Sequence, residues 1–462
     1  MSLGETMPNL TQLRLAAREI FDETLRAVDA GDAVRRAVRL EGPRLNVRDT
    51  SIDIVNRKVY SIAIGKAAFT LAYALEQALG EAFTAGFMSG SVPGSNALGL
   101  KGMPEWARPT RWRWCEGGHP LPTKTSLLAA GEAFALLYLA NQERALVVFL
   151  ISGGGSAMIE SPISEHISLS DLRAANEALV NCGASIGEIN AVRRAFSAIK
   201  GGCLAARAPN CDQITLIVSD VPAGEERNVA SGPTLTPPAD APDARDVIAR
   251  FKLRAQLPET ILRVIDAEPR PSEVKSERLR EHFVLLDNND ALEAAAEAAR
   301  RRGFIIKNAE NISDQPIEEG CALLLARLRA LSESDYPDKP GSVCLISGGE
   351  FACPVSGDGI GGRNLETALR LACSSNLSLS DSEHFVALCA GTDGVDGNSP
   401  AAGAIVDNTT LQRARAIGLN AEDFLKRSDA YSFCVALGDA IATGPTGTNV
   451  RDLRILLRNR SQ

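Results

Sequence analysis

Two glycine-rich segments in this chain each follow directly on a run of apolar residues. The first, Ser152-Gly153-Gly154-Gly155-Ser156, comes after the apolar run 145–151, and the second, Ser347-Gly348-Gly349-Glu350, comes after residues 342–346. Apolar runs of this length are typical of strands buried in a parallel sheet. Glycines let backbone N–H groups approach a ligand closely, and such donors suit an anion. We therefore expect two α/β units of similar design, with the chemistry in a cleft between them.

Charged side chains stand at the ends of two further predicted strands. Lys66 lies between the strand 58–64 and a helix, where the free N–H groups of a helix start favour a phosphate. A solvated lysine at a helix start also fits this pattern and is the more common case. Asp220 follows the strand 213–219, and the functional residues of α/β enzymes commonly lie at the carboxyl ends of parallel strands. Both residues are therefore candidates for catalysis.

Three more side chains could hold an acidic substrate. Arg193 and Lys200 lie close together in an otherwise acidic chain, and cationic groups of this kind bind carboxylates. A solvated helix face is an equally good interpretation of this cluster. His119 belongs to a rigid turn of glycines and prolines, where it could contact a substrate or make a structural hydrogen bond.

The densest motif of the chain is the segment 356–364. Its glycines Gly357, Gly359 and Gly362 spell GxGxxG, which is the dinucleotide fingerprint but is a weak signal alone. Arg363 follows at the predicted start of a helix, so a guanidinium would stand beside free backbone amides. Such a corner would bind an anion strongly, and a nucleotide polyphosphate fits it.

Two later loops complete the set of polar segments. Asp393 and Asp396 lie three residues apart in a glycine-rich loop that could bind Mg²⁺, although Asp-Gly pairs also make ordinary turns. The loop 443–449 is rich in hydroxyl and amide groups, includes Thr446, and precedes a final strand. We expect this loop to return to the site.

The composition limits the class of protein. A chain of 462 residues exceeds what one hydrophobic core usually holds, so we expect two domains, 1–238 and 239–462, divided by the Pro-, Ala- and Asp-rich segment 237–242. The net charge of −8 argues against a nucleic-acid partner. The longest apolar runs are much shorter than the roughly 20 residues of a membrane span, and the N-terminus lacks an apolar signal region. We expect a cytoplasmic protein without a membrane partner.

Taken together, these stretches resemble the glycerate 2-kinases that carry a MOFRL C-terminal domain. The resemblance runs nearly from end to end, and it depends on the order and joint presence of motifs that are individually unspecific. The matching segments are 65–67, 118–120, 151–157, 189–193, 199–202, 219–222, 230–234, 347–350, 361–364, 391–396 and 443–449.

The resemblance implies two Rossmann-like α/β/α domains with mostly parallel sheets, the MOFRL region covering about residues 340–458. It also implies ATP-dependent phosphorylation of D-glycerate to 2-phospho-D-glycerate, with ATP and Mg²⁺ as cofactors, and leaves a monomer or a homodimer open. By position, Lys66, Asp220 and Arg363 correspond to the polar residues on which catalysis in the family depends.

The remaining candidate residues take their roles from this mechanism. Lys66 and Arg363 would supply positive charge, and Asp220 would accept the proton of the 2-hydroxyl group. The expected substrate and phosphate ligands are Ser152, Gly153, Gly154, Gly155, Ser156, His119, Arg193 and Lys200. The expected nucleotide ligands are Ser347, Gly348, Gly349, Glu350, Gly361, Gly362, Asn364 and Thr446, and the expected metal ligands are Asp393 and Asp396.

This chain differs from the family's usual sequence at two places, and two alternative functions were considered. The family's basic helix usually continues Arg-Lys-His where this chain has Arg193-Arg194-Ala195, and the turn after Asp220 has Ala223-Gly224-Glu225 where Gly-Asp-Asp is common. An NAD(P)-dependent hydroxypyruvate reductase would use the GxGxxG segment, but that segment should then follow the first strand of a βαβ unit. A non-catalytic sugar-acid sensor would not need Asp220, Asp393, Lys66 and Arg363 together.

Overall fold

The computed structural model describes residues 9–90, 111–267, 277–306, 310–333, 342–374 and 384–459. These residues form two units. The parallel-sheet unit contains the described residues between 30 and 286. The mixed-sheet unit contains the described residues 9–29 together with those from 287 to 459.

The parallel-sheet unit is built on six parallel strands in the order β6-β5-β4-β7-β8-β9. Numbered along the chain, this is the order 3-2-1-4-5-6 of a doubly wound sheet. The central strands are fully buried, as their apolar sequences predict. The strands are β4 (Val59–Ile64), β5 (Phe83–Gly90), β6 (Trp112–Glu116), β7 (Leu146–Ser152), β8 (Asp212–Val218) and β9 (Arg280–Leu286).

Helices cover this sheet, and a further group of helices packs around its own apolar core. Helix α4 lays a row of alanines and leucines, including Ala133 and Leu137, on the sheet residues Ile62, Val147 and Phe149. The second group consists of α6 to α9. The helices are α2 (Ala30–Ala37), α3 (Ala68–Leu79), α4 (Lys124–Gln142), α5 (Gly155–Met158), α6 (Leu169–Asn181), α7 (Ile186–Phe196), α8 (Ala244–Arg250) and α9 (Glu259–Asp266). Short 3₁₀ turns span Gly80–Ala82, Ala205–Arg207, Glu226–Ser231 and Leu253–Ala255, and a small antiparallel sheet joins β1 (Val38–Glu41), β2 (Arg44–Val47) and β3 (Thr50–Asp53).

The mixed-sheet unit has a different topology. Its strands lie in the order β10-β12-β16-β13-β14-β15, with β11 also paired to β12. Only β10 and β11 run parallel to β12, whereas β16 lies antiparallel between β12 and β13. The strands are β10 (Ile305–Ile306), β11 (Glu310–Asn311), β12 (Val343–Gly348), β13 (Phe385–Gly391), β14 (Gly403–Asp407), β15 (Ala440–Ile441) and β16 (Asp452–Arg458).

The predicted α/β class is confirmed, and so is a parallel arrangement for the first sheet. The prediction of a mostly parallel second sheet is wrong, because β13, β14, β15 and β16 are joined to their neighbours antiparallel. An apolar run shows that a strand is buried on both faces but does not show its direction. Direction depends on the connections, and β13 and β14 are joined without a helix between them.

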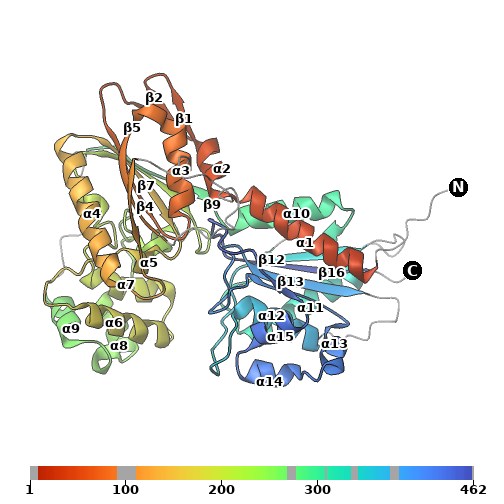
Figure 1. Ribbon diagram of the computed structural model, residues 1–462. Coiled ribbons are helices and arrows are strands. Elements are labelled where there is room, and N and C mark those ends of the chain that lie inside the picture. Colours follow the sequence, from red (N-terminus) through yellow and green to blue (C-terminus); the bar gives the residue numbers. More distant parts are fainter. Residues whose placement is uncertain are drawn as a thin grey trace. The chain divides into compact units, whose positions relative to one another are not determined.

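Helices cover both faces of the mixed sheet (Figure 1). One core joins the sheet to α11, α12 and α15, and the other joins it to α1 and α10. The helices are α1 (Leu10–Ala27), α10 (Asn288–Arg301), α11 (Ile317–Glu333), α12 (Arg363–Ser374), α13 (Thr410–Ala416), α14 (Ala421–Lys426) and α15 (Ala430–Ala436). No helix in the described ranges is long and apolar enough to cross a membrane.

The boundary between the two units differs from the predicted one at residue 238. Helix α1, near the start of the chain, buries Leu13 and Phe21 in the same core as Leu292 and Ile455 of the mixed-sheet unit. Residues 239–286 stay with the first unit, because β9 pairs with β8. A change in local composition at 237–242 marks a loop but does not show which sheet the chain rejoins.

The packing of α1 yields a stability prediction. Phe21 is completely buried between α1 and the mixed sheet, so replacing it by alanine leaves a cavity, and we expect Phe21→Ala to lower the free energy of unfolding by about 3–5 kcal/mol. Leu15 on the same helix is 58% exposed, and Leu15→Ala should change it by less than about 0.5 kcal/mol. Urea denaturation measures both, and equal effects would contradict the placement of α1.

Candidate active site

The first candidate site lies where the strand order of the parallel-sheet unit reverses. Strands β4 and β7 are neighbours there, and the turns after them carry Lys66 and Gly153. The Ser152 hydroxyl donates to the Ile64 carbonyl at 3.2 Å and accepts the Ala67 N–H at 3.0 Å, while the Lys66 N–H donates to the Gly153 carbonyl at 2.9 Å. The two predicted loops therefore form one structure at a switch point, where doubly wound sheets bind ligands. Ser152 at the end of β7 thus joins this strand to the turn after β4, because its hydroxyl bonds both the Ile64 carbonyl and the Ala67 N–H.

The glycines of this turn are required by close packing. Gly154 has φ +78°, and a Cβ atom there would lie 3.1 Å from side-chain carbons of both His119 and Lys66. A Cβ atom on Gly155 would lie 2.8 Å from side-chain carbons of Ile64 and Ala230. The structure thus brings together His119, Lys66 and the glycine turn, which the sequence analysis named separately.

A chain of polar groups extends from the turn to helix α7. The hydroxyl groups of Ser156 and Ser231 are 2.8 Å apart, and Ser231 Oγ donates to Asn190 Oδ1 at 2.8 Å. Asn190 Nδ2 in turn donates to Asn228 Oδ1 at 3.3 Å. Sequence reasoning placed residues 189–193 and 230–234 in the resemblance but did not assign Ser231 or Asn190 a role, because it could not show that two distant segments meet.

Lys200 differs from its predicted role as a substrate ligand. Its ammonium group forms a buried ion pair with Glu160 and also donates to the Ser156 carbonyl at 3.0 Å. Ser197 Oγ donates to the other oxygen of Glu160 at 2.6 Å. Burial lowers the pKa of Lys200, and Glu160 opposes that shift. Lys200 therefore holds the glycine turn through the Ser156 carbonyl. Its charge is balanced by Glu160, a residue that was not predicted from the sequence.

Arg193 and Asp220 are placed in ways compatible with their predicted roles. Arg193 lies on α7, its Nε atom is buried without a hydrogen-bond partner, and burial lowers its pKa although Glu160 opposes this. Asp220 follows β8, the strand next to β7, and is half-buried at the same edge of the sheet as the glycine turn. Arg193 is thus a half-buried cation with one buried, unused donor.

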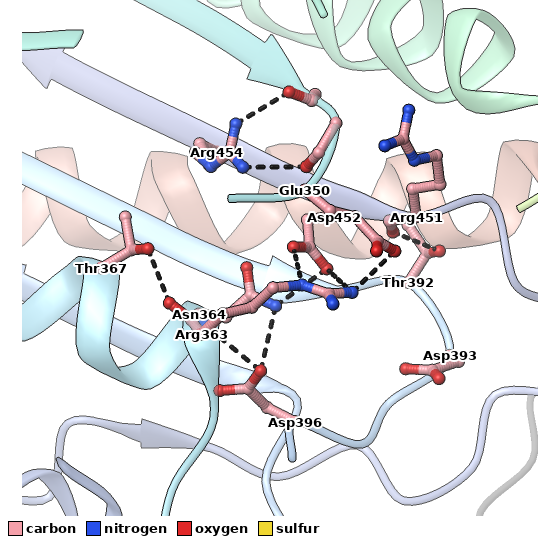
Figure 2. Close-up of polar contacts among 12 residues, drawn as sticks. Glu350, Arg363, Asn364, Thr367, Thr392, Asp393, Asp396, Arg451, Asp452 and Arg454 are labelled. Carbon is pink, nitrogen blue, oxygen red and sulfur yellow. Dashed lines mark hydrogen bonds and ion pairs between the residues drawn. The ribbon is translucent and has the colours of Figure 1, made fainter. Parts of the chain in front are cut away.

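The second candidate site lies in the mixed-sheet unit around Arg363 (Figure 2). Arg363 Nε donates to Asp452 Oδ2 at 2.6 Å, and its Nη2 group lies 3.3 Å from Asp452 Oδ1 and 2.6 Å from Glu350 Oε1. Burial lowers the pKa of Arg363, but the two carboxylates outweigh this and raise it well above its usual value. In the same way, burial raises the pKa of Asp452 but Arg363 keeps it below the usual value. The guanidinium is thus permanently charged and held in one orientation.

Asp396 caps helix α12 rather than standing ready for a metal. Its Oδ1 accepts the Asn364 N–H at 3.1 Å and the Asn364 side-chain amide at 3.2 Å, and its Oδ2 accepts the Leu365 N–H at 2.8 Å. These are the unpaired donors of a helix start. Burial raises the pKa of Asp396 to about 7, although the two backbone donors oppose this. Both oxygens are in use, so the predicted metal ligation by Asp396 is not favoured.

Asp393, in the same loop, is a separate case. Its Oδ1 accepts the Val395 N–H at 3.1 Å, and Figure 2 shows its carboxylate apart from the network around Arg363. Within the described residues, no three His, Cys, Asp or Glu side chains are grouped so that they could hold a metal ion.

Arg454 holds the second Ser-Gly-Gly segment in place. It is almost completely buried, donates to the carbonyl groups of Gly348 at 2.7 Å and Gly349 at 2.8 Å, and stacks over the Phe351 ring at 3.6 Å. Gly349 has φ +81° and its N–H donates to Asn288 Oδ1 at 2.8 Å. Asp452 and Arg454 project from β16, the strand that the sequence predicted after the loop 443–449. The charged residues within this otherwise apolar strand were the available signal.

The remaining predicted nucleotide ligands are largely engaged in local structure. The Gly361 N–H donates to Asn398 Oδ1 at 2.8 Å, and a Cβ atom on Gly362 would lie 2.4 Å from Asp396. Thr446 donates its hydroxyl to the Thr392 carbonyl at 2.6 Å, while its N–H donates to the Asp393 carbonyl at 3.1 Å. These contacts fix the loops but leave ligand binding by their other groups a prediction.

The GxGxxG segment lacks the setting of a dinucleotide fingerprint. Strand β12 ends at Gly348, well before the segment, instead of leading directly into it. Gly357 and Gly359 instead lie against the backbone of residues 427–429, where any Cβ atom would come within 2.7 Å of it. Their lack of a side chain is therefore explained by packing.

Comparison with known proteins decides the family. Residues 16–266 match a domain of unknown function (DUF4147), and residues 343–452 match the MOFRL family. A glycerate 2-kinase from Pyrococcus horikoshii is 34% identical over 452 residues, which cover 96% of this chain and 97% of that protein. The chain belongs to the glycerate 2-kinase family. The solved structure of a glycerate kinase from Thermotoga maritima agrees, with a TM-score of 0.75 at 31% identity over 97% of this chain and 99% of that one.

Some relatives carry another name. A protein from Agrobacterium vitis, named only provisionally as a hydroxypyruvate reductase, is 38% identical over 348 residues, covering 74% of this chain and 76% of its own. The packing of Gly357 and Gly359 gives no support to a dinucleotide site in this member of the glycerate 2-kinase family.

The buried ion pair predicts a large stability effect at Lys200. Removing one partner leaves an uncompensated buried charge, so Lys200→Met should lower the free energy of unfolding by about 3–5 kcal/mol. In Lys200→Met/Glu160→Gln both charges are gone and the acceptor for Ser197 remains, so most of the loss should be recovered. Denaturation with urea compares the three proteins. A stable single variant with a raised KM for substrate would instead restore the predicted binding role.

Asp396 predicts a particular pH dependence. Because its folded pKa is about 7 and thus above that of an unfolded aspartate, its contribution to stability is complete below about pH 4 and is lost as the pH rises through 7. Relative to Asp396→Asn, the wild type should therefore lose about 2–3 kcal/mol of unfolding free energy between pH 5 and pH 8. Urea denaturation at several pH values measures this difference. A difference that stays constant would mean that Asp396 is already ionised at pH 5.

Proposed function

We propose that this chain transfers the γ-phosphoryl group of ATP to the 2-hydroxyl group of D-glycerate, giving 2-phospho-D-glycerate and ADP. The observation that carries the proposal is the meeting of Lys66, His119 and the Gly153–Ser156 turn at the switch point of a doubly wound sheet. Full-length relatives named for glycerate kinase activity support the same substrate and the same transfer.

The parallel-sheet unit offers the groups that phosphoryl transfer requires. Such a reaction needs cations on the phosphoryl oxygens and a residue that orients the attacking hydroxyl. In this proposal Lys66 and the backbone amides of the glycine turn bind the phosphoryl group, and Asp220 accepts the proton of the 2-hydroxyl. Arg193 binds the glycerate carboxylate, since its Nε donor is buried and unpaired. Lys200 no longer belongs to this set.

In the mixed-sheet unit, Arg363 is the proposed source of positive charge on the nucleotide. Glu350 and Asp452 take up its Nε and Nη2 donors and fix its plane. No hydrogen bond from its Nη1 group is found in the described part of the chain, and 35% of the side chain is exposed. The nearby segments 347–350, 361–364 and Thr446 form the proposed nucleotide pocket.

Mg²⁺ accompanies ATP in this proposal. It usually keeps several waters and is bound by one or two carboxylates together with the phosphates of the nucleotide, so a full cage of protein ligands is not needed. Asp393 fits that limited role better than Asp396, because both oxygens of Asp396 accept helix N–H groups. When bound, the ion would neutralise charge on the phosphates.

We also propose a cytoplasmic location and no nucleic-acid partner, on the acidic composition.

Two substitutions test the reaction and its assigned residues. With MgATP and D-glycerate, Lys66→Met and Asp220→Asn should each lower kcat by about 10²- to 10⁴-fold, because each removes a group that acts in the transition state. A coupled assay measures ADP release, and phosphorus NMR identifies the product.

The control for charge loss is Lys124→Met, which replaces an exposed lysine at the start of α4. It should retain wild-type kcat, and urea denaturation should show that all three variants remain folded. The proposed reaction is wrong if the wild type releases no ADP but oxidises NADH in the presence of hydroxypyruvate. The assigned roles alone are wrong if ADP forms and both variants keep their activity.

A further inference from the structure

Arg451 is a buried arginine with an unpaired side-chain donor. Its side chain is only 5% exposed, and its Nε atom is buried without a hydrogen bond. No carboxylate among the described residues lies within ion-pair distance of it, and Figure 2 shows its guanidinium turned away from the Arg363 network. A buried donor without an acceptor is unfavourable, and an acceptor supplied by a ligand would remove that cost.

The backbone of Arg451 is also strained, and it is held firmly in that state. Its φ angle is +71°, which costs a residue with a Cβ atom on the order of 1 kcal/mol. Its carbonyl accepts both the N–H and the hydroxyl of Thr392, at 3.0 and 2.7 Å. On either side, Asn288 Nδ2 donates to the carbonyls of Val450 at 2.6 Å and Asp452 at 3.2 Å. The backbone at Arg451 is therefore held in place by Thr392 and Asn288.

A second unpaired donor lies in the same turn. The Thr448 hydroxyl is buried without a hydrogen-bond partner, three residues before Arg451. By contrast, Thr446 in that turn is bonded to Thr392, so the turn is not generally short of partners. A hydroxyl and a guanidinium are both donors of the kind that bind an oxyanion.

We propose that Arg451 binds a phosphate group. The planar fork of a guanidinium matches phosphate oxygens, and a buried site makes each such contact stronger than at the surface. The phosphate belongs either to the nucleotide or to the phosphorylated acid. This identification of the source rests on the proposed kinase reaction, whereas the binding of phosphate does not.

Two variants separate binding from structure. Arg451→Asn removes the cation, and asparagine tolerates a positive φ angle better than arginine does. Because no partner is lost and strain is reduced, Arg451→Asn should be at least as stable as the wild type in urea. Arg451→Lys keeps the charge but loses the fork. Arg415→Gln is the matched control, since Arg415 is an exposed arginine on α13 of the same unit.

The first measurement is calorimetric titration, without turnover, of inorganic phosphate, MgADP and 2-phosphoglycerate. Arg451→Asn should weaken binding of inorganic phosphate by about tenfold or more, Arg451→Lys by less, and Arg415→Gln not at all. A selective loss for MgADP assigns the phosphate to the nucleotide, and a selective loss for 2-phosphoglycerate assigns it to the phosphorylated acid.

The same titration distinguishes failure of the site from failure of the reaction. Unchanged affinity for all three ligands in Arg451→Asn would overturn the phosphate site even if the wild type is an active kinase. Loss of phosphate binding in a protein that releases no ADP would keep the site and refute the reaction. Strong destabilisation of Arg451→Asn with unchanged binding would mean that Arg451 is a structural residue.

Discussion

The ion pair between Arg363 and Asp452 is the interaction on which the mixed-sheet unit depends. Asp452 begins the last strand, and that strand lies in the middle of the sheet between β12 and β13. Arg363 begins helix α12, and Glu350 adds a second carboxylate from the turn after β12. One buried pair therefore ties the start of a helix, the start of a central strand and a glycine turn to each other. A pair of this kind contributes less to stability than to a single arrangement of the groups around it.

Each unit builds a glycine turn and then supports it with a buried cation from a distant segment. Lys200 donates to the Ser156 carbonyl in one unit, and Arg454 donates to the Gly348 and Gly349 carbonyls in the other. In both cases the cation binds carbonyl oxygens of the turn and so fixes its backbone. The buried charge is balanced by Glu160 in the first case and lies over the Phe351 ring in the second. Similar local sequences thus came with similar means of support, although the two sheets differ in topology.

The sequence predicted individual strands and turns better than it predicted which of them pair or pack together. Buried strands such as β7 and β12, and the turns that follow them, could be predicted because apolar runs and glycines act over a few residues. The meeting of Lys66 with the Gly153–Ser156 turn could also be expected from parallel strands. The antiparallel insertion of β16 and the return of α1 to the second sheet could not, because both are choices among pairings that bury similar apolar area. Asp452, Glu160 and Ser231 escaped notice for the same reason, since each acts on a residue far away in the chain.

The cationic residues show how partners decide function. From the sequence, Lys200, Arg193 and Arg363 are all candidates for binding an anion, and Arg451 is not singled out. In the structure Lys200 is matched by Glu160, while Arg363 keeps one edge exposed after its two carboxylates are placed. Arg193 and Arg451 retain buried donors without acceptors. Burial of a donor without a partner costs free energy that packing elsewhere must offset, and an anion that accepts from these side chains would remove that cost. A count of charges along the chain could not separate these cases, because the difference lies entirely in what each charge contacts.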